Sequence, residues 1–192
     1  MIYDFENKTI QVKIVYYGPA MSGKTTSLKY IFNYFRIPSK LESIENTVGR
    51  TLFFDFGVLQ MNGIEWKLKF LMYSATGQDF YVSTRPTILK GVDGIIFVAD
   101  SQMKNLEHNL RSWNELKTLF GIDFYNIPVV IALNKYDLGG DSKLSKDNFA
   151  KNIKSERFKK ISLNETSAIS GLGIIESFKQ MICFLFPQLT IN

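Results

Sequence analysis

The sequence predicts a mixed α/β fold with a central, mostly parallel sheet of about six strands, one antiparallel edge strand, and helices on both faces. Apolar segments of strand length alternate with segments whose apolar residues recur at helical spacing, the pattern of parallel strands joined by crossover helices. One pair of strand-like runs is separated only by Asn62-Gly63, a dipeptide typical of β-hairpins. The two strands of that pair are therefore expected to be antiparallel.

Each element is assigned in chain order from these patterns. Strands are expected at residues 10–17, 51–61, 64–73, 94–99 and 127–133, with a short one near Ile161. A helix is expected at residues 24–35. A second helix is indicated by an apolar stripe of Leu106, Leu110, Trp113, Leu116 and Leu119. The last helix, which Pro187 ends, carries Ile174, Ile175, Phe178, Met181, Ile182 and Leu185.

Length and composition predict a single domain over residues 1–192. The chain is 45% hydrophobic and 21% charged, as is usual for a globular domain with one well-buried core. No repeat, low-complexity segment or Gly/Ser-rich linker divides it. The lone cysteine, Cys183, can form no internal disulfide and lies in the apolar pattern of the last helix, so we expect a buried thiol without a role.

Charge and targeting signals favour neither a nucleic acid nor a membrane as partner. Ile2 excludes N-myristoylation, and the final residues QLTIN hold no cysteine for prenylation. No apolar segment reaches the roughly 18 residues that span a bilayer, and the beginning of the chain does not resemble a signal peptide. We therefore expect a cytoplasmic protein without a direct membrane anchor. The net charge of +5 is modest, and a solvated face is expected for the basic residues Lys151, Lys154, Arg157, Lys159 and Lys160.

A phosphate-binding loop follows the first strand. Residues 18–25 match the pattern G-x-x-x-x-G-K-[ST] at the point where the first helix begins. Backbone N–H groups of such a loop and the positive end of the helix hold phosphates, and glycine lets the backbone approach them closely. Lys24 is expected to reach the β- and γ-phosphates, and Thr25 to ligate Mg²⁺. The expected nucleotide-binding residues of this segment are Gly18, Pro19, Ala20, Met21, Ser22, Gly23, Lys24, Thr25 and Thr26.

Two later segments indicate that the nucleotide carries guanine. Asn134-Lys135-Tyr136-Asp137 follows the strand at 127–133. The Asp137 carboxylate can accept from both N1–H and the 2-amino group of guanine, a donor pair that adenine lacks. Lys135 can lay its stem along the purine face, and Asn134 can tie this loop to the phosphate-binding loop. Ser167-Ala168 follows the short strand near Ile161, and the Ala168 N–H is expected to donate to guanine O6.

Together these motifs resemble the Ras-like small GTPase superfamily, most closely its bacterial gliding-motility and polarity branch, the MglA branch. The resemblance spans essentially the whole chain, and its most telling segments are KIVYYGPAMSGKTT, RTLFFDF, TGQDFY and GVDGIIFVADS. It implies a small G-domain of the P-loop NTPase class that binds GTP or GDP with Mg²⁺ and hydrolyses GTP.

The resemblance also implies roles for residues near the γ-phosphate. Thr51 corresponds to the switch threonine that ligates Mg²⁺, and the Gly77 N–H should meet the γ-phosphate. Gln78 should orient the attacking water, and Arg50 resembles an arginine finger supplied by the chain itself. Arg85 is the lesser candidate for that finger. The expected catalytic residues are thus Gln78, Arg50 and Lys24, and the expected metal ligands are Thr25 and Thr51.

The chain departs from the superfamily pattern at two positions. Ser74 stands where an acidic residue usually holds Mg²⁺ through water, which leaves one fewer negative charge near the metal. Ala20 stands where glycine is common, and its methyl group could crowd Gln78 or Arg50, so we hypothesise slow intrinsic hydrolysis. Asp55 is open to two interpretations: an acid left in water by an edge strand, or, by resemblance, an acid that changes partners when the strand shifts between nucleotide states.

Partners follow from the resemblance alone. It implies a Roadblock-fold, MglB-like activating protein, effectors that read the GTP state, a monomeric chain, and recruitment to a cell pole through partners. Aromatic residues anchor many interfaces, and those near the two switch segments are Phe53, Phe54, Trp66, Phe80 and Tyr81.

Two other functions compete with a hydrolysing switch. A GTP-bound scaffold with negligible hydrolysis is motivated by Ala20 and Ser74. An ATP-dependent kinase is disfavoured because the Asn134–Asp137 motif has no use in one. His108 lies between polar neighbours of a helix and is expected at the surface.

Overall fold

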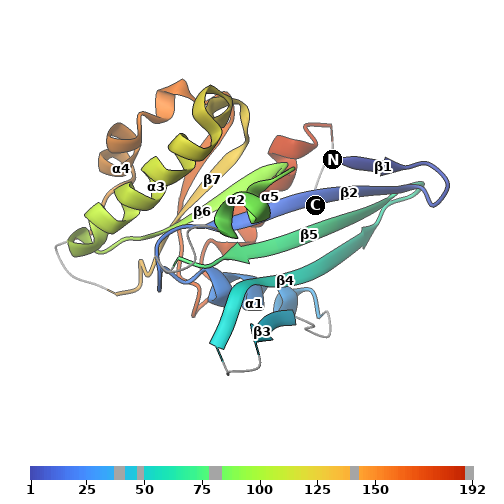
Figure 1. The fold of residues 1–192 in the computed structure, drawn as a ribbon, viewed down its shortest axis with the longest axis horizontal. Helices are drawn as coiled ribbons and strands as arrows, with labels where there is room; N and C mark the ends of the chain where they lie inside the picture. The colour runs from blue at the N-terminus through green and yellow to red at the C-terminus, as the bar shows by residue number, and fades with distance from the viewer. Residues whose placement is uncertain (37–41, 47–49, 78–83, 139–142, 189–192) are drawn as a thin grey trace.

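The computed structural model describes residues 1–36, 42–46, 50–77, 84–138 and 143–188, with backbone alone for 42–46 and 50–54. The strands of this described part belong to one eight-stranded sheet in the order β3-β4-β5-β2-β6-β7-β8, with β1 paired to β2 (Figure 1). The strands are β1 Ile2–Asp4, β2 Thr9–Tyr17, β3 Glu42–Asn46, β4 Arg50–Asn62, β5 Lys67–Ala75, β6 Gly94–Asp100, β7 Val129–Asn134 and β8 Ile161–Glu165. The α-helices are α1 Lys24–Tyr34, α2 Arg85–Leu89, α3 Leu106–Phe120, α4 Lys146–Ile153 and α5 Ile174–Leu185.

Helices cover both faces of the sheet, as predicted. Alternate residues of β2 point to opposite faces, as strand geometry requires: Ile14 packs in the cluster formed with α1 and α5, and Val15 packs in the cluster formed with α2, α3 and α4. β6 alternates in the same way and is buried along its whole length. The central strands are therefore fixed from both sides.

The six predicted strands are present as β2, β4, β5, β6, β7 and β8, and among them β4 alone runs antiparallel to its neighbour. Two short strands add to them. β1 pairs with residues 9–11 of β2, on the edge that β6 leaves uncovered because β6 pairs only with residues 14–17. β3 pairs antiparallel with β4, so β4 is not the edge of the sheet. Neither added strand has a strong apolar alternation, which is why the sequence pattern missed them.

Three predicted positions differ in detail. β5 begins at Lys67 instead of residue 64, because residues 63–66 form the hairpin loop, in which the Gly63 N–H donates to the Trp66 carbonyl at 2.9 Å. Leu119 is 40% exposed, since Trp113, Leu116 and the half-buried Phe120 follow the helical repeat toward the sheet and Leu119 lies off that face. Cys183 is exposed, not buried, because its neighbours Met181 and Ile182 turn toward the core.

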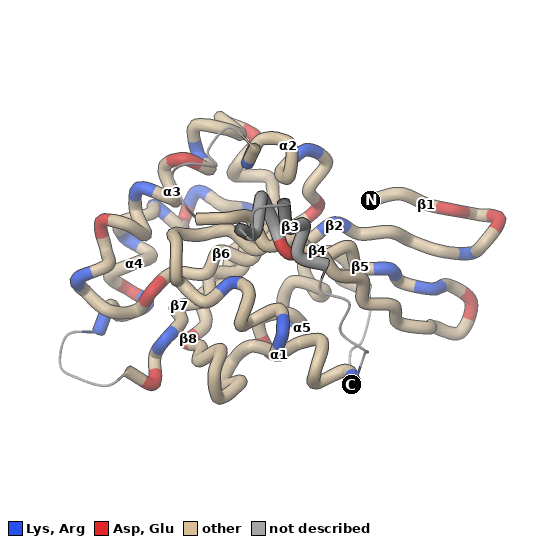
Figure 2. Tube along the Cα trace, turned by 60° about the horizontal axis from the view of Figure 1, so that its bottom comes forward, with Lys and Arg blue, Asp and Glu red and all other residues tan. Residues whose placement is uncertain are grey.

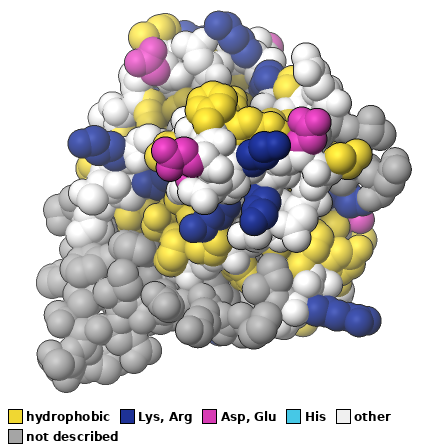
Figure 3. All heavy atoms as spheres, turned by 90° about the vertical axis from the view of Figure 1, so that its right-hand side faces the viewer, with side chains coloured by type: hydrophobic (Ala, Val, Ile, Leu, Met, Phe, Trp, Pro, Cys, Tyr) yellow, Lys and Arg dark blue, Asp and Glu magenta, His cyan; other side chains and the backbone are white. Residues whose placement is uncertain are grey.

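Charged residues are spread over the helices, whereas several exposed apolar side chains gather at one end of the sheet. Positive and negative residues are interspersed along α3 and α4 (Figure 2), and Lys151, Lys154 and Lys159 are exposed as expected. At the end of the sheet formed by the β1–β2 and β4–β5 turns, hydrophobic side chains reach the surface (Figure 3), among them Phe5 and Ile64. None of the described helices combines the length and apolar character needed to cross a membrane.

The aromatic cluster around Trp113 should carry much of the stability. Its ring lies 5.1 Å from Phe97, 5.0 Å from Phe124 and 5.5 Å from Phe158, centroid to centroid. We expect Trp113→Ala to lower the free energy of unfolding by about 3–5 kcal/mol, measured by urea denaturation. Leu119→Ala on the same helix is the control and should change it by less than about 0.5 kcal/mol. Equal effects would contradict the assignment of the core.

Candidate functional site

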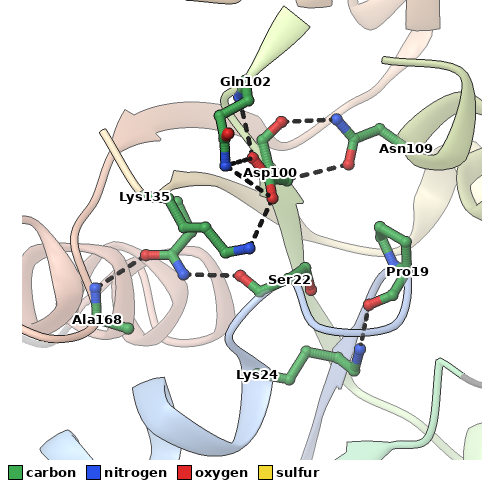
Figure 4. Close-up of polar contacts among 9 residues, drawn as sticks. Pro19, Ser22, Lys24, Asp100, Gln102, Asn109, Lys135 and Ala168 are labelled. Carbon is green, nitrogen blue, oxygen red and sulfur yellow. Dashed lines mark hydrogen bonds and ion pairs between the residues drawn. The ribbon is translucent and has the colours of Figure 1, made fainter. Parts of the chain in front are cut away.

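The predicted site residues gather at the carboxyl ends of the parallel strands. The loop 18–23 follows β2, Gln102 follows β6, Lys135 follows β7, and Ala168 lies just beyond β8 (Figure 4). These strands are neighbours in the order β2-β6-β7-β8, so their ends form one rim of the sheet, where ligands of open α/β folds bind. Four segments that lie far apart in the sequence therefore become adjacent.

Close packing explains the glycines of the phosphate-binding loop. Gly18 has φ +140° and Gly23 has φ +105°, backbone conformations that side chains disfavour. A Cβ on Gly18 would lie 2.2 Å from the Val98 carbonyl oxygen, and one on Gly23 would lie 2.1 Å from Asn134 Nδ2. The loop therefore packs against both β6 and the Asn134 side chain. Met21 also has positive φ and is exposed, a backbone strain that the sequence motif did not reveal.

Lys24 is a buried cation whose partners in the described chain are neutral carbonyls. It is 6% exposed, and its Nζ donates to the carbonyls of Gly18 at 2.8 Å and Pro19 at 2.6 Å. Burial, aided by the positive charge of Arg85 and opposed by Asp55, lowers the pKa of Lys24 to about 7. The pocket therefore disfavours the ammonium until an anion arrives, which suits a phosphate site.

Asn134 connects the segments of the site. Its Nδ2 donates to the Ser22 carbonyl at 2.7 Å, which is the predicted tie between the Asn134–Asp137 segment and the phosphate-binding loop. Its Oδ1 accepts from the Ala168 N–H at 2.8 Å and from the Thr166 hydroxyl at 3.3 Å. In this structure the Ala168 N–H, predicted to face the base, therefore donates to Asn134. Three loops are held together by one side chain.

The other residues predicted to contact the base differ in how exposed they are. Asp137 is exposed, as an acid that must reach a ligand should be. Lys135 has φ +63°, and its Nζ pairs with Asp100 at 2.7 Å. Ser167 is fully buried, and its hydroxyl accepts from the Ser170 N–H at 3.4 Å. Ser167 thus shapes the loop that carries Ala168.

A carboxylate lies beside Thr25, although Ser74 replaces the usual acid on β5. Asp55 on β4 is the register partner of Ser74, and it accepts a hydrogen bond from the Thr25 hydroxyl. Asp55 is only 7% exposed, which excludes the water-exposed interpretation in this structure, because its side chain lies against Thr25 of α1. A hydroxyl that donates its one hydrogen keeps its lone pairs for a cation, and carboxylate and hydroxyl oxygens are ligands that Mg²⁺ accepts. Among the described residues, no cluster of three or more His, Cys, Asp or Glu side chains competes as a metal site.

The switch residues are placed only in part. Gly77 lies directly on the phosphate-binding loop, since a Cβ there would be 2.2 Å from the Ala20 nitrogen. Arg50 and Thr51 are backbone positions of β4, paired with Asn46 and Glu45 of β3. Gln78, Phe80 and Tyr81 lie outside the described residues. Asp55 faces Ser43 and Thr51 faces Glu45, so four residue steps of β4 lie opposite two of β3, and β4 bulges between the two positions.

Two other predicted residues have defined structural partners. Arg85 is buried, with its guanidinium paired to Glu115 of α3 and its Nε donating to the Thr76 carbonyl at 3.1 Å. These contacts hold the Arg85 side chain between α2 and α3. Trp66, expected near the switches, lies instead in the turn at the far end of β4 and β5 and packs on Phe5, with centroids 5.5 Å apart. Trp66 lies far from the predicted nucleotide site because β4 is long and Trp66 follows its distant end.

Asp100 is a central residue of the site that was not among the predicted ones. It is the last residue of β6, is 4% exposed, and receives Lys135. Its signal was available in the sequence, since a polar residue at the carboxyl end of an otherwise apolar strand often faces the ligand rim.

Comparison with known proteins agrees with this geometry. The model of the ADP-ribosylation factor family matches residues 1–184. The mutual gliding-motility protein MglA of Myxococcus xanthus (strain DK1622) is 37% identical over 192 aligned residues, which cover 97% of this chain and 96% of that protein. The ADP-ribosylation factor-like protein 6 of Caenorhabditis elegans is 30% identical over 175 residues, covering 88% of this chain and 84% of that protein.

The lowered pKa of Lys24 makes ligand binding a proton-linked event. Above about pH 8 the unliganded Lys24 is mostly neutral, and a bound phosphate should raise its pKa and charge it. We expect GDP binding to take up close to one proton at pH 8.5 and much less at pH 6, measured by calorimetry in buffers of different ionisation enthalpy. Binding heats at pH 8.5 that do not depend on the buffer would contradict this account.

Proposed function

The chain belongs to the ADP-ribosylation factor family of Arf/Ras-like small GTPases, and from that premise we propose that it is a GTP-dependent switch that recruits effectors in its GTP state. As a member of this family it is a GTP hydrolase. The observation that carries the switch proposal is the convergence of Lys24, Thr25 and Asp55 beneath a rim that also presents Asp137. A triphosphate and its metal would meet the fixed loop and β4 at the same point.

Nucleotide binding uses residues of the rim in defined ways. The N–H groups of residues 18–26 and the beginning of α1 would hold the phosphates, with Lys24 on the β- and γ-phosphates. Asp137 would accept from the guanine N1–H and 2-amino group, and Lys135 would lie along the purine face. Ala168 would donate to O6 once its N–H is shared with the base.

Mg²⁺ would be held first by Thr25, whose hydroxyl lone pairs remain available beside Asp55. When bound, the ion would supply positive charge that offsets the negative charge of the phosphates. Thr51 would join as a ligand in the GTP state. Asp55 supplies near Thr25 the carboxylate that Ser74 does not, so the departure at Ser74 does not remove negative charge from the metal region.

Hydrolysis would follow from residues of the two switch segments. Gln78 would orient a water for in-line attack on the γ-phosphorus, the bond to the bridging oxygen would break, and GDP and phosphate would leave. Arg50 would neutralise the charge that develops, an effect of about 10³–10⁵ in rate for arginine fingers. Arg85 is less suited, because its guanidinium is engaged by Glu115 and the Thr76 carbonyl. Ala20 lies against Gly77 and could slow the reaction by crowding it.

The switch itself would be a displacement of β4. In this structure the Thr25 hydroxyl donates to Asp55, and Thr51 lies four residues earlier on β4, beyond a bulge in its pairing with β3. We infer two positions of β4: Asp55 at Thr25 without the γ-phosphate, and Thr51 there with it. Binding energy from the γ-phosphate and metal would select the second position.

Partners and location follow by similarity. The related protein MglA is named for gliding motility, and we propose a comparable role in motility or polarity, with GTP-state effectors and a Roadblock-fold, MglB-like activator. We propose that the chain is cytoplasmic and monomeric and that its recruitment to a cell pole would depend on those partners. The alternative, a GTP-bound scaffold with negligible turnover, is favoured by Ala20 alone.

Single-turnover hydrolysis of preloaded GTP with Mg²⁺ tests the catalytic assignments. We expect slow turnover in the natural chain and a decrease of at least about 100-fold in Gln78→Leu and in Arg50→Ala, with GTP still bound in both. Ala20→Gly should increase the rate. Retained GTP without any turnover, alone or with an activating partner, would support the scaffold instead.

A cross-link between β4 and β5 tests the strand displacement. Gln60 and Lys69 are register partners, and facing residues of antiparallel strands lie about 4.5–5.5 Å apart at Cα, within disulfide range. In a Cys183→Ser background, oxidised Gln60→Cys/Lys69→Cys should keep GDP affinity but lose at least about tenfold in affinity for a non-hydrolysable GTP analogue, about 1.4 kcal/mol. Reduction should restore it, and Gln60→Cys alone should show no redox effect. Unchanged analogue affinity in the oxidised protein would exclude the displacement.

A further inference from the structure

The Asp100 carboxylate is placed between the end of β6 and the lysine of the base-binding loop. Lys135 Nζ lies 2.7 Å from Asp100 Oδ2, and the Gln102 N–H donates to Asp100 Oδ1 at 3.0 Å (Figure 4). The Gln102 side-chain amide adds a contact of 3.2 Å to the same oxygen. The acid is therefore hydrogen-bonded on both oxygens before any ligand binds.

Asp100 is also fixed through its main chain. Asn109 of α3, which is fully buried, accepts from the Asp100 N–H at 3.0 Å and donates to the Asp100 carbonyl at 2.8 Å. This pair of bonds anchors the end of β6 to α3. The position of the carboxylate is thus set by buried groups on two elements, whereas the Lys135 side chain remains partly exposed.

This asymmetry determines which residue orients the other. A lysine side chain has many rotamers, and holding it in one costs conformational entropy. Lys135 lines a cavity of about 600 Å³ that Pro19, Met21, Asp100 and Gln102 also border. The charge-assisted bond to the fixed carboxylate directs the Lys135 stem across this space, beside the phosphate-binding loop.

We propose that Asp100 is a positioning residue that holds the Lys135 stem in place for the purine face and so sets how long a guanine nucleotide stays bound. The inference rests on the proposed guanine-binding role of Lys135. Without the carboxylate, the free Lys135 side chain samples more rotamers. Stacking on the base then costs more conformational entropy, so the nucleotide is bound less tightly and dissociates faster.

Dissociation of a fluorescent GDP derivative tests the proposal, with Asp100→Asn as the variant. The matched control is Asp93→Asn: Asp93 immediately precedes the other end of the same strand and is also ion-paired, there with the chain amino group. We expect Asp100→Asn to dissociate GDP about tenfold faster than the natural chain, and the control to stay within about twofold. A rate unchanged in Asp100→Asn would overturn the proposal, whereas a natural chain that does not retain GDP would overturn the proposed function as well.

Two further readouts separate positioning from general loosening of the loop. In a Lys135→Met background, Asp100→Asn should increase the GDP dissociation rate by less than about twofold, because the lysine that Asp100 positions is gone. The ratio of affinities for GDP and inosine diphosphate, which lacks the 2-amino group, should be the same in Asp100→Asn and the natural chain, because Asp137 is untouched. Full acceleration in the Lys135→Met background, or a lost GDP preference, would show that Asp100 merely supports the loop and would overturn the proposal.

Discussion

The buried ammonium of Lys24 is the constraint around which the site is arranged. An isolated charge in a desolvated pocket is costly, and here the nearest oxygens are backbone carbonyls of the loop that surrounds it. The pKa of Lys24 is lowered by this cost, first through burial and then through the positive charge of Arg85. A polyphosphate removes the cost by supplying the missing negative charge, so the unliganded site already favours an anionic ligand.

Two parts of the sheet meet near Lys24: a fixed part, and a part proposed to move with the nucleotide state. On the fixed side, β6 and β7 are fully buried and end at Asp100 and Asn134, which hold the loops proposed to bind the base through networks of hydrogen bonds. On the other side, β4 reaches the same point from the antiparallel part of the sheet and presents Asp55 to Thr25. In the proposed function, buried parallel strands would therefore recognise the base, and a strand near the edge would respond to the γ-phosphate.

The sequence predicted the parts of the fold and site that depend on local pattern. The six predicted strands have apolar patterning, and the phosphate-binding loop has fixed spacing. β3 has neither and was missed, and the burial of Asp55 depends on its contact with Thr25, 30 positions away, which the pattern of one strand does not reveal. Trp66 and Cys183 were misplaced because their surroundings depend on the length of a hairpin and the rotation of a helix. The position of Asp100 at a strand end was visible in the sequence, but its contact with Lys135 was not, because the two residues lie 35 positions apart and meet only through the parallel register.

Amide hydrogen exchange of the full chain, loaded with GDP or with a non-hydrolysable GTP analogue, tests the central claim of a strand-based switch most directly. The account predicts that amides of β3 and β4 exchange at different rates in the two states, because the pairing of β4 with its neighbours changes. Amides of β6 and β7 should exchange alike in both states, since the base is the same. Identical exchange in β4 with both nucleotides fully bound would contradict the account.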